Sequence, residues 1–137
     1  MKKYTLKKYS TLILGGLFLL SGIIFGLKER TSITETNHHL PIIKSIQESE
    51  YTILQFHAKW CPNCVKQDLS LKAIQRLPRY SKISFIEVDY NKSNALKNHY
   101  NVKRQSTFIV FKKGKEIGRK IGLSNQTKIQ TYLNEII

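Results

Sequence analysis

Short blocks of apolar residues recur from position 41 to the end of the chain, and polar residues separate them. Runs rich in β-branched and aromatic residues predict buried strands, whereas apolar residues three and four positions apart predict helices. The strands predicted in this way are 51–56, 83–88, 107–111 and 116–121. The predicted helices are 41–50, 62–77, 93–100 and a last one after Ser124, a residue suited to the N-cap.

The order of these elements indicates the fold class. Strands and helices alternate at first, and the last two strands form a hairpin around residues 112–115, which favours an α/β domain with a mixed sheet. Pro78 is expected to end the helix at 62–77. The apolar residues of that helix are assigned to the core: Val65, Leu69, Ala73, Ile74 and Leu77. The last helix is expected to bury one face with Ile129, Tyr132, Leu133 and Ile136.

The first 27 residues have a different pattern. Residues 1–10 carry four lysines and no acid, and residues 11–27 form a run without a charge. A helix over this run is about 25 Å long, at the short end of what spans a bilayer. We therefore predict a basic cytoplasmic flank at 1–10 and a transmembrane anchor at 11–27, with the rest of the chain outside the cytoplasm.

A cleaved signal peptide is the competing interpretation of residues 11–27. No small-x-small cleavage pattern follows this run, so we favour an uncleaved anchor. Residues 28–40 are predicted to link the membrane to a domain at 41–137, which is long enough for one small core. The neighbouring His38 and His39 in this linker are assigned no role.

Positive charge exceeds negative charge throughout the chain. The formal net charge is +14, and from Pro41 onward 17 Lys and Arg residues face 7 Asp and Glu residues. A nucleic-acid-binding protein would group its basic residues with aromatic ones on one face, whereas here they are spread over predicted helices, turns and loops. The composition therefore argues against a nucleic-acid partner and favours an anionic membrane surface and acidic client surfaces.

The only two cysteines, Cys61 and Cys64, lie where the first predicted strand meets the helix at 62–77. We expect Cys61 at the N-cap and Cys64 one turn later, because the first turn of a helix brings residues at this spacing together. Pro62 suits the first helical position, where a missing N–H costs nothing. The free N–H groups and positive dipole end of that turn favour a thiolate on Cys61. Cys61 is therefore predicted to be the attacking thiol, and Cys64 the resolving one.

Structural zinc and inert buried thiols are the alternatives for this pair. A structural zinc site needs four ligands, but the chain has no second cysteine pair, and its four histidines show no spacing that would complete a site. Inert thiols do not explain why both cysteines lie at a strand-to-helix joint directly after Trp60. The context favours a redox-active pair, with no metal.

The run from Trp60 to Cys64 resembles the Trp-Cys-x-x-Cys active site of thioredoxin-like proteins, and the resemblance extends from about Ile42 to the C-terminus. It includes Val88-Asp89 at a strand end, Tyr100-Asn101-Val102 before a loop, and the strand and turn from Phe108 to Gly114. The resemblance implies a thioredoxin-like three-layer α/β/α fold around a central mixed sheet, here without the family's first edge strand. It also implies a redox disulfide between the two cysteines.

Ser106 stands where the family usually has a cis-proline facing the dithiol. A cis bond before serine costs about 3 kcal/mol, so we expect a trans Gln105–Ser106 peptide. The resemblance implies that Gln105, Ser106 and Thr107 grip the client strand, and the Ser106 hydroxyl is suited to bind a thiolate. If this loop keeps the family's role, proline should be accepted at position 106.

Gln55 stands where thioredoxins often bury an aspartate that helps to deprotonate the resolving thiol. Glutamine cannot take a proton at neutral pH. Glu87, on the neighbouring predicted strand, is a candidate to replace that carboxylate. A solvent-facing glutamate without a role in catalysis is the other interpretation.

The resemblance further implies a membrane-anchored, extracytoplasmic thiol–disulfide oxidoreductase of bacterial type. It would be held in the cytoplasmic membrane by a single pass, with the C-terminal domain facing the periplasm. Cys61 would attack a client disulfide and Cys64 would release it, with Trp60, Pro62 and Asn63 in supporting positions and no cofactor. Electrons would come from a membrane carrier of the DsbD or CcdA kind, and the clients would be disulfide-bearing exported proteins such as apocytochrome c.

Two other functions stay open at this point. A disulfide-donating oxidase is less favoured, because Pro62-Asn63 places no cation between the cysteines and the chain lacks the helical insertion of dedicated oxidases. A non-catalytic metal carrier or assembly factor would use the same fold as a scaffold. Copper carriers on this fold space their cysteines further apart and add a distal histidine, so the spacing here argues against that alternative.

Overall fold

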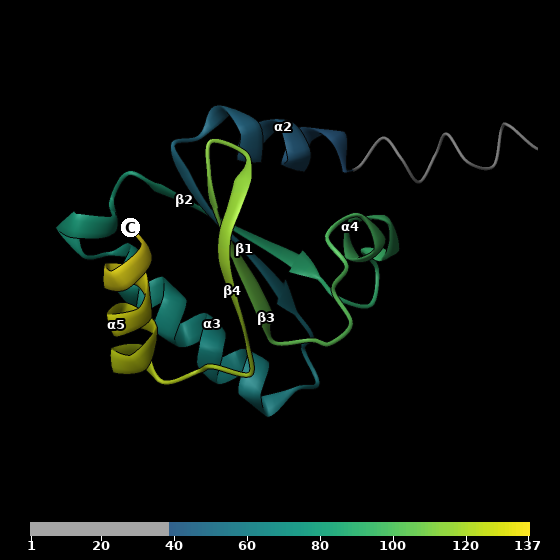
Figure 1. Cartoon of the computed structure of the whole chain (residues 1–137). Coiled ribbons are helices and arrows are strands. Elements are labelled where there is room, and N and C mark those ends of the chain that lie inside the picture. Colours follow the sequence, from purple (N-terminus) through teal and green to yellow (C-terminus); the bar gives the residue numbers. More distant parts are fainter. Residues whose placement is uncertain (1–38) are drawn as a thin grey trace, which may run out of the picture. The chain divides into compact units, whose positions relative to one another are not determined.

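A computed structural model describes residues 39–137 of the chain, shown in Figure 1. The predicted flank, anchor and nearly all of the linker lie outside the described residues. In chain order the elements are α2 (Leu40–Glu48), β1 (Tyr51–His57), α3 (Pro62–Gln75), η1 (Pro78–Tyr80), β2 (Ile83–Asp89), α4 (Asn94–His99), β3 (Thr107–Lys112), β4 (Lys115–Ile121) and α5 (Gln126–Ile136). No helix within 39–137 has the length and apolar character that a bilayer span requires.

The four strands form one mixed sheet in the order β2-β1-β3-β4. Strand β1 runs parallel to β2 and antiparallel to β3, and β4 is antiparallel to β3. The β3–β4 hairpin turns through Lys113 and Gly114, whose φ angles of 47° and 78° suit the twist of the flanking strands. The predicted α/β class and mixed sheet are confirmed.

Two apolar cores fill the two faces of this sheet. Because side chains alternate along a strand, Ile53 packs into one core and its neighbour Leu54 into the other. The first core also contains Leu71 of α3 and Leu133 of α5, and the second contains Ile46 of α2. Figure 1 shows α3 and α5 beside one another, away from α2 and α4. The helices therefore form the outer layers of an α/β/α arrangement.

The core face of α3 differs from the prediction. Val65 and Leu69 are 42% and 63% exposed, so assigning them to the core was wrong. The buried residues of the helix are Cys64, Gln67, Leu71 and Ile74. Their spacing of three, four and three residues keeps them on one side of the helix, so Val65 and Leu69 lie on another side. A buried glutamine in this line made the apolar pattern misleading.

The ends of the helices also differ from the predicted ones by one or two residues. Helix α3 ends at Gln75, and Pro78 begins the short helix η1. Asn125 rather than Ser124 caps α5, and its side chain accepts a hydrogen bond from the backbone N–H of Lys128 at 3.0 Å. The predicted buried face of α5 is confirmed, with Ile129 and Leu133 buried and Tyr132 and Ile136 partly buried: all four contact the same core.

Candidate active site

The two cysteines occupy the first turn of α3, as predicted. Cys61 is the N-cap in an extended conformation, and its Sγ accepts a hydrogen bond from the backbone N–H of Cys64 at 3.2 Å. Pro62 is the first helical residue. Both thiols are free, and they differ in exposure: Cys61 keeps 7% of its surface and Cys64 keeps none. Cys61 is therefore the more exposed of the two cysteines.

The surroundings of Cys64 oppose its ionisation. Burial raises the pKa of the Cys64 thiol, and its hydrogen bond with Cys61 raises it further. The backbone of Ala58 and the side chain of Ser106 act in the other direction and lower the same pKa. The Cys64 thiol is therefore harder to ionise than a free cysteine, and the Ala58 backbone and the Ser106 side chain partly offset this effect.

Ser106 lies in a loop that packs against this turn. No peptide bond in the described part of the chain is cis, which confirms the expected trans Gln105–Ser106 bond. Ser106 has a left-handed φ of 58°, and its N–H donates to the carbonyl of Phe56 at 3.0 Å. Its carbonyl accepts from the N–H of Gly122 at 2.8 Å and from Gln67 Nε2 at 3.1 Å. Both backbone groups of Ser106 are thus bonded within the protein.

This geometry contradicts the premise that proline would fit at position 106. Proline fixes φ near −65° and has no N–H, whereas Ser106 has a φ of 58° and uses its N–H in a hydrogen bond. Acceptance of proline was expected only if this loop kept the family's role. Here serine instead adopts the left-handed conformation, which non-glycine residues seldom adopt.

Asn63, between the two cysteines, connects the dithiol turn to two distant loops. Its Nδ2 donates to Ser106 Oγ at 2.8 Å and to the carbonyl of Gly122 at 3.0 Å. Its Oδ1 accepts from Ser124 Oγ at 2.8 Å. Three hydrogen bonds therefore fix the side chain of Asn63. In the sequence, only its position between the two cysteines indicated a supporting role.

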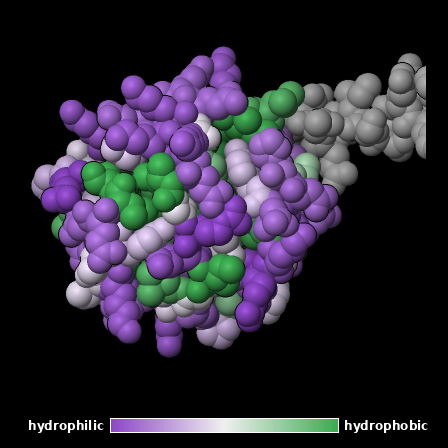
Figure 2. Space-filling model, viewed as in Figure 1, coloured by the Kyte–Doolittle hydropathy of each residue, from purple (hydrophilic) through white to green (hydrophobic). Residues whose placement is uncertain are grey.

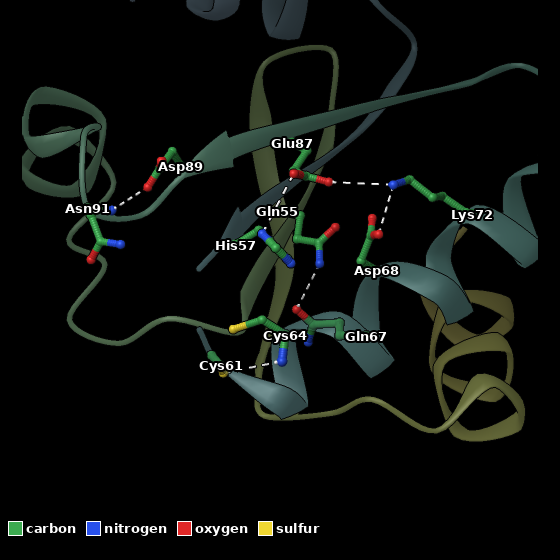
Figure 3. Close-up of polar contacts among 10 residues, drawn as sticks. All are labelled: Gln55, His57, Cys61, Cys64, Gln67, Asp68, Lys72, Glu87, Asp89 and Asn91. Carbon is green, nitrogen blue, oxygen red and sulfur yellow. Dashed lines mark hydrogen bonds and ion pairs between the residues drawn. The ribbon is translucent and has the colours of Figure 1, made fainter. Parts of the chain in front are cut away.

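Gln67 is a site residue that sequence reasoning missed. It is completely buried, and its Nε2 donates to the carbonyls of Leu123 at 2.7 Å and Ser106 at 3.1 Å. Its Oε1 accepts a long, 3.4 Å hydrogen bond from Gln55 Nε2, shown in Figure 3. A polar residue three positions after Cys64, on the same side of the helix, was the signal available in the sequence.

Gln55 and Glu87 lie opposite each other on β1 and β2 but in different surroundings. Gln55 is buried beside Gln67, whereas Glu87 is 46% exposed and belongs to a group of charged side chains. His57 Nδ1 lies 3.7 Å and Lys72 Nζ 3.9 Å from its carboxylate (Figure 3). Burial, followed by a hydrogen bond with Asp68, raises the pKa of Glu87. Glu87 is therefore a perturbed carboxylate in a cluster, and its role as a proton acceptor for Cys64 stays a prediction.

The remaining predicted residues differ widely in exposure. Trp60 is 65% exposed, so its ring is presented to solvent rather than packed into the domain. Gln105 is half-buried, and Thr107 is buried with its hydroxyl donating to the carbonyl of Arg104 at 2.6 Å. The face of the domain in Figure 2 is largely hydrophilic, with separate hydrophobic patches.

Residues 39–137 contain no group of three or more His, Cys, Asp and Glu side chains that would hold a metal ion.

Comparisons with known proteins agree with this architecture. The sequence model of the thioredoxin family matches residues 30–135. The chain is 31% identical to thioredoxin of Sus scrofa over 85 residues, which are 62% of this chain and 78% of that protein. It is 26% identical to the thioredoxin Asp f 28 of Aspergillus fumigatus over 97 residues, 70% of this chain and 88% of that protein.

Solved structures show the same fold. The crystal structure of Trxlp from Edwardsiella tarda matches with a TM-score of 0.65 at 22% identity, covering 69% of this chain and 91% of that one. Mitochondrial thioredoxin 3 of Saccharomyces cerevisiae matches with a TM-score of 0.62 at 23% identity, covering 70% and 88%. Together with the Cys61/Cys64 pair at the start of α3, these matches place the chain in the thioredoxin family, whose members are thiol–disulfide oxidoreductases.

Proposed function

We propose that this thiol–disulfide oxidoreductase is a membrane-anchored, extracytoplasmic reductant of protein disulfides. The observation that carries the proposal is the asymmetry of the dithiol: Cys61 is the N-cap of α3 and keeps 7% of its surface exposed, whereas Cys64 is completely buried. That asymmetry suits a two-step exchange in which one sulfur meets the client and the other closes the cycle.

The exchange proceeds through a mixed disulfide. The Cys61 thiolate attacks one sulfur of a client disulfide, forms a bond to it and expels the other client sulfur as a thiolate. Cys64 then loses its proton to solvent and attacks Cys61 Sγ, so that the Cys61–Cys64 disulfide forms and the first client sulfur leaves. The client gains two electrons and the protein loses two.

The client-binding role falls mainly to Trp60 and Gln105. Trp60 offers an exposed aromatic surface beside Cys61. Both backbone groups of Ser106 are already bonded within the protein, so Gln105 is the member of the loop through which a client strand pairs. Thr107 is buried and starts β3, where it supports the loop from behind.

The support for the proposed direction of electron flow is the way in which the reduced site is stabilised. A strong oxidant owes its high potential to a strongly stabilised reduced form. Here the Cys61 sulfur accepts the hydrogen bond from Cys64 N–H, and the residues between the cysteines are proline and a neutral asparagine. The reduced form is therefore only modestly stabilised, which favours a reductant. Donation of the disulfide to clients is the competing direction.

The location and the electron donor rest on the N-terminal sequence. The charge-free run at 11–27, preceded by four lysines, supports a single membrane pass with the catalytic domain outside the cytoplasm. A reductant in that compartment needs a supply of electrons across the membrane, so its partner is a membrane thiol carrier of the DsbD or CcdA kind. Its clients are exported proteins that carry disulfides.

The reduction potential of the Cys61–Cys64 pair tests the direction. We expect a value near that of thioredoxin, about −270 mV, when the full chain is equilibrated with a thiol buffer and the free thiols are counted. Cys64→Ser is the matched control, since it cannot form the intramolecular disulfide. A value near −120 mV, which is typical of strong oxidants, would reverse the proposed direction.

A reporter that is active only outside the cytoplasm tests the topology. Fused after Ile137, it should be active, and the fusion should stay in the membrane fraction after a carbonate wash. The matched control lacks residues 1–27 and should give an inactive cytoplasmic fusion. A soluble, shortened form that starts after Leu27 would show instead that the segment is a cleaved signal peptide.

A further inference from the structure

The amide of Asn63 has its two ends fixed by its neighbours. The carbonyl of Gly122 can only accept a hydrogen bond, so the atom that faces it at 3.0 Å must be Nδ2. The other end, Oδ1, then accepts from the hydroxyl of Ser124 at 2.8 Å. One N–H of Nδ2 is used on Gly122, and the other points to Ser106 Oγ at 2.8 Å.

This arrangement determines what the Ser106 hydroxyl can do. Since Asn63 donates to Ser106 Oγ, that oxygen is the acceptor, and its single hydrogen is left for a different partner. Ser106 is only 4% exposed, so the hydrogen has little access to solvent. Asn63 is next to Cys64 in the chain, and Gln67, one turn further along α3, binds the Ser106 carbonyl at 3.1 Å. The hydroxyl is thus held against the turn that carries the Cys64 sulfur.

We propose that Asn63 orients the Ser106 hydroxyl as a hydrogen-bond donor to Cys64 Sγ, and that this bond stabilises the Cys64 thiolate in the resolving step. The inference rests on the proposed function and assigns Asn63 as a positioning residue for it. The lowering of the Cys64 pKa by the Ser106 side chain agrees with such a bond. Gln55 cannot accept the proton of Cys64, as an aspartate at this position would. The Ser106 hydroxyl would instead favour the Cys64 thiolate by donating a hydrogen bond to it.

The step that depends on this bond is the second half of the exchange. Cys64 releases its proton to solvent, its thiolate attacks Cys61 Sγ, and the client sulfur leaves with the electron pair of the broken bond. The titratable groups packed around Cys64 are Cys61 and Tyr90, while Asp68 and Glu87 belong to the charged cluster beyond the Gln55–Gln67 pair. None of the hydrogen bonds of Asn63 involves those carboxylates.

Stopped-flow oxidation of the reduced full chain by dithiobis-nitrobenzoate separates the two steps, because each releases one coloured thionitrobenzoate. The first phase reports attack by Cys61 and the second reports resolution by Cys64, so Cys64→Ser should lose the second phase alone. Ser106→Gly keeps the left-handed backbone and removes the hydroxyl. Its second phase should slow about tenfold near neutral pH, the change expected for one lost hydrogen bond to a charged group.

Asn63→Ala should slow the second phase in the wild-type background but change it less than about twofold in the Ser106→Gly background, because both variants remove the same bond. In each single variant the pH profile of the second phase should move to higher pH, an effect that loosened packing alone does not produce. Ser70→Ala is the matched control: it removes a similar bond from α3, to the carbonyl of Ser124, without touching Ser106.

Additive effects of the two substitutions, an unmoved pH profile, or an equal slowing in Ser70→Ala would overturn the inference. Equal slowing of both phases would also overturn it, since the bond is assigned to Cys64 alone. These failures differ from failure of the proposed function, in which the wild-type chain would form no Cys61–Cys64 disulfide in the same experiment.

Discussion

Helix α3 takes part in two polar clusters of contrasting chemistry. The neutral cluster joins Asn63 and Gln67 to the Ser106 loop and to residues 122–124 by hydrogen bonds of 2.7–3.1 Å. The charged cluster joins Asp68 and Lys72 to Glu87 and His57 on the sheet, and its members are partly exposed. Both clusters come from the same helix, but only the neutral one surrounds the dithiol turn.

The two clusters differ in what they contribute to the domain. A buried amide that loses its hydrogen-bond partner is destabilised by the full free energy of its desolvation. Arrangements that break these bonds are therefore unfavourable, and the neutral cluster favours a single geometry. Exposed ion pairs are screened by water and salt and contribute little to stability. The neutral cluster therefore holds the redox site in shape, and the charged cluster adjusts local ionisation without determining the structure.

Ser106→Pro should be the most disruptive change to the neutral cluster. Proline cannot adopt the φ of 58° and removes the bond from Ser106 N–H to Phe56, so we expect a loss of about 3 kcal/mol or more in the free energy of unfolding. Ser106→Gly, which accepts that φ, should stay within about 1 kcal/mol of the wild type. Urea denaturation measures both. A proline variant as stable as the glycine variant would show that the loop can switch to another conformation.

Gln67→Ala should have the next largest effect. It leaves the carbonyl of Leu123 and the amide of Gln55 without their partner in a buried site, so we expect a loss of about 2–3 kcal/mol that does not depend on salt. Gln75→Ala, at the exposed end of the same helix, should change stability by less than about 0.5 kcal/mol. Equal effects of the two substitutions in urea denaturation would remove the contrast between the clusters.

Glu87→Gln should have the smallest effect on stability, and this effect should depend on pH. Because the pKa of Glu87 is raised above its ordinary value of 4.5, the folded state binds a proton more tightly there than the unfolded state. The wild type should therefore lose stability relative to Glu87→Gln as pH rises from about 4.5 through the raised pKa. The difference should stay below about 1 kcal/mol and shrink in high salt, since the side chain is half exposed.

Thermal denaturation across pH, with Glu135→Gln as the control from the exposed end of α5, checks this sign. A Glu87→Gln variant that becomes less stable than the wild type as pH rises would mean that the ionised carboxylate is stabilising. The charged cluster would then support the fold as the neutral one does.

The local features of the fold were predictable from the sequence, and the contacts over long sequence separations were not. The strand at 51–56, the N-cap position of Cys61 and the hairpin around Lys113-Gly114 depend on neighbouring residues, and the structure confirms them. Val65 and Leu69 were misassigned because the buried side of α3 includes the polar Gln67 as well as Cys64, and a count of apolar residues does not identify that side. The bond between Asn63 and Ser124 joins residues 61 positions apart, for which a single sequence offers no signal.

The bonds of Gln67 also have a consequence for the order in which the domain folds. The cysteine turn needs only residues within one strand–helix unit, whereas the Gln67 bonds close chain segments of 39 and 56 residues, to Ser106 and Leu123. Closing long loops costs entropy that must be recovered by contacts formed afterwards. The turn is therefore able to form early, while the loops around it are completed only when the C-terminal third of the chain has docked. A nascent chain that ends before Gly122 would carry both thiols without the bonds from Asn63 to Gly122 and from Gln67 to Leu123.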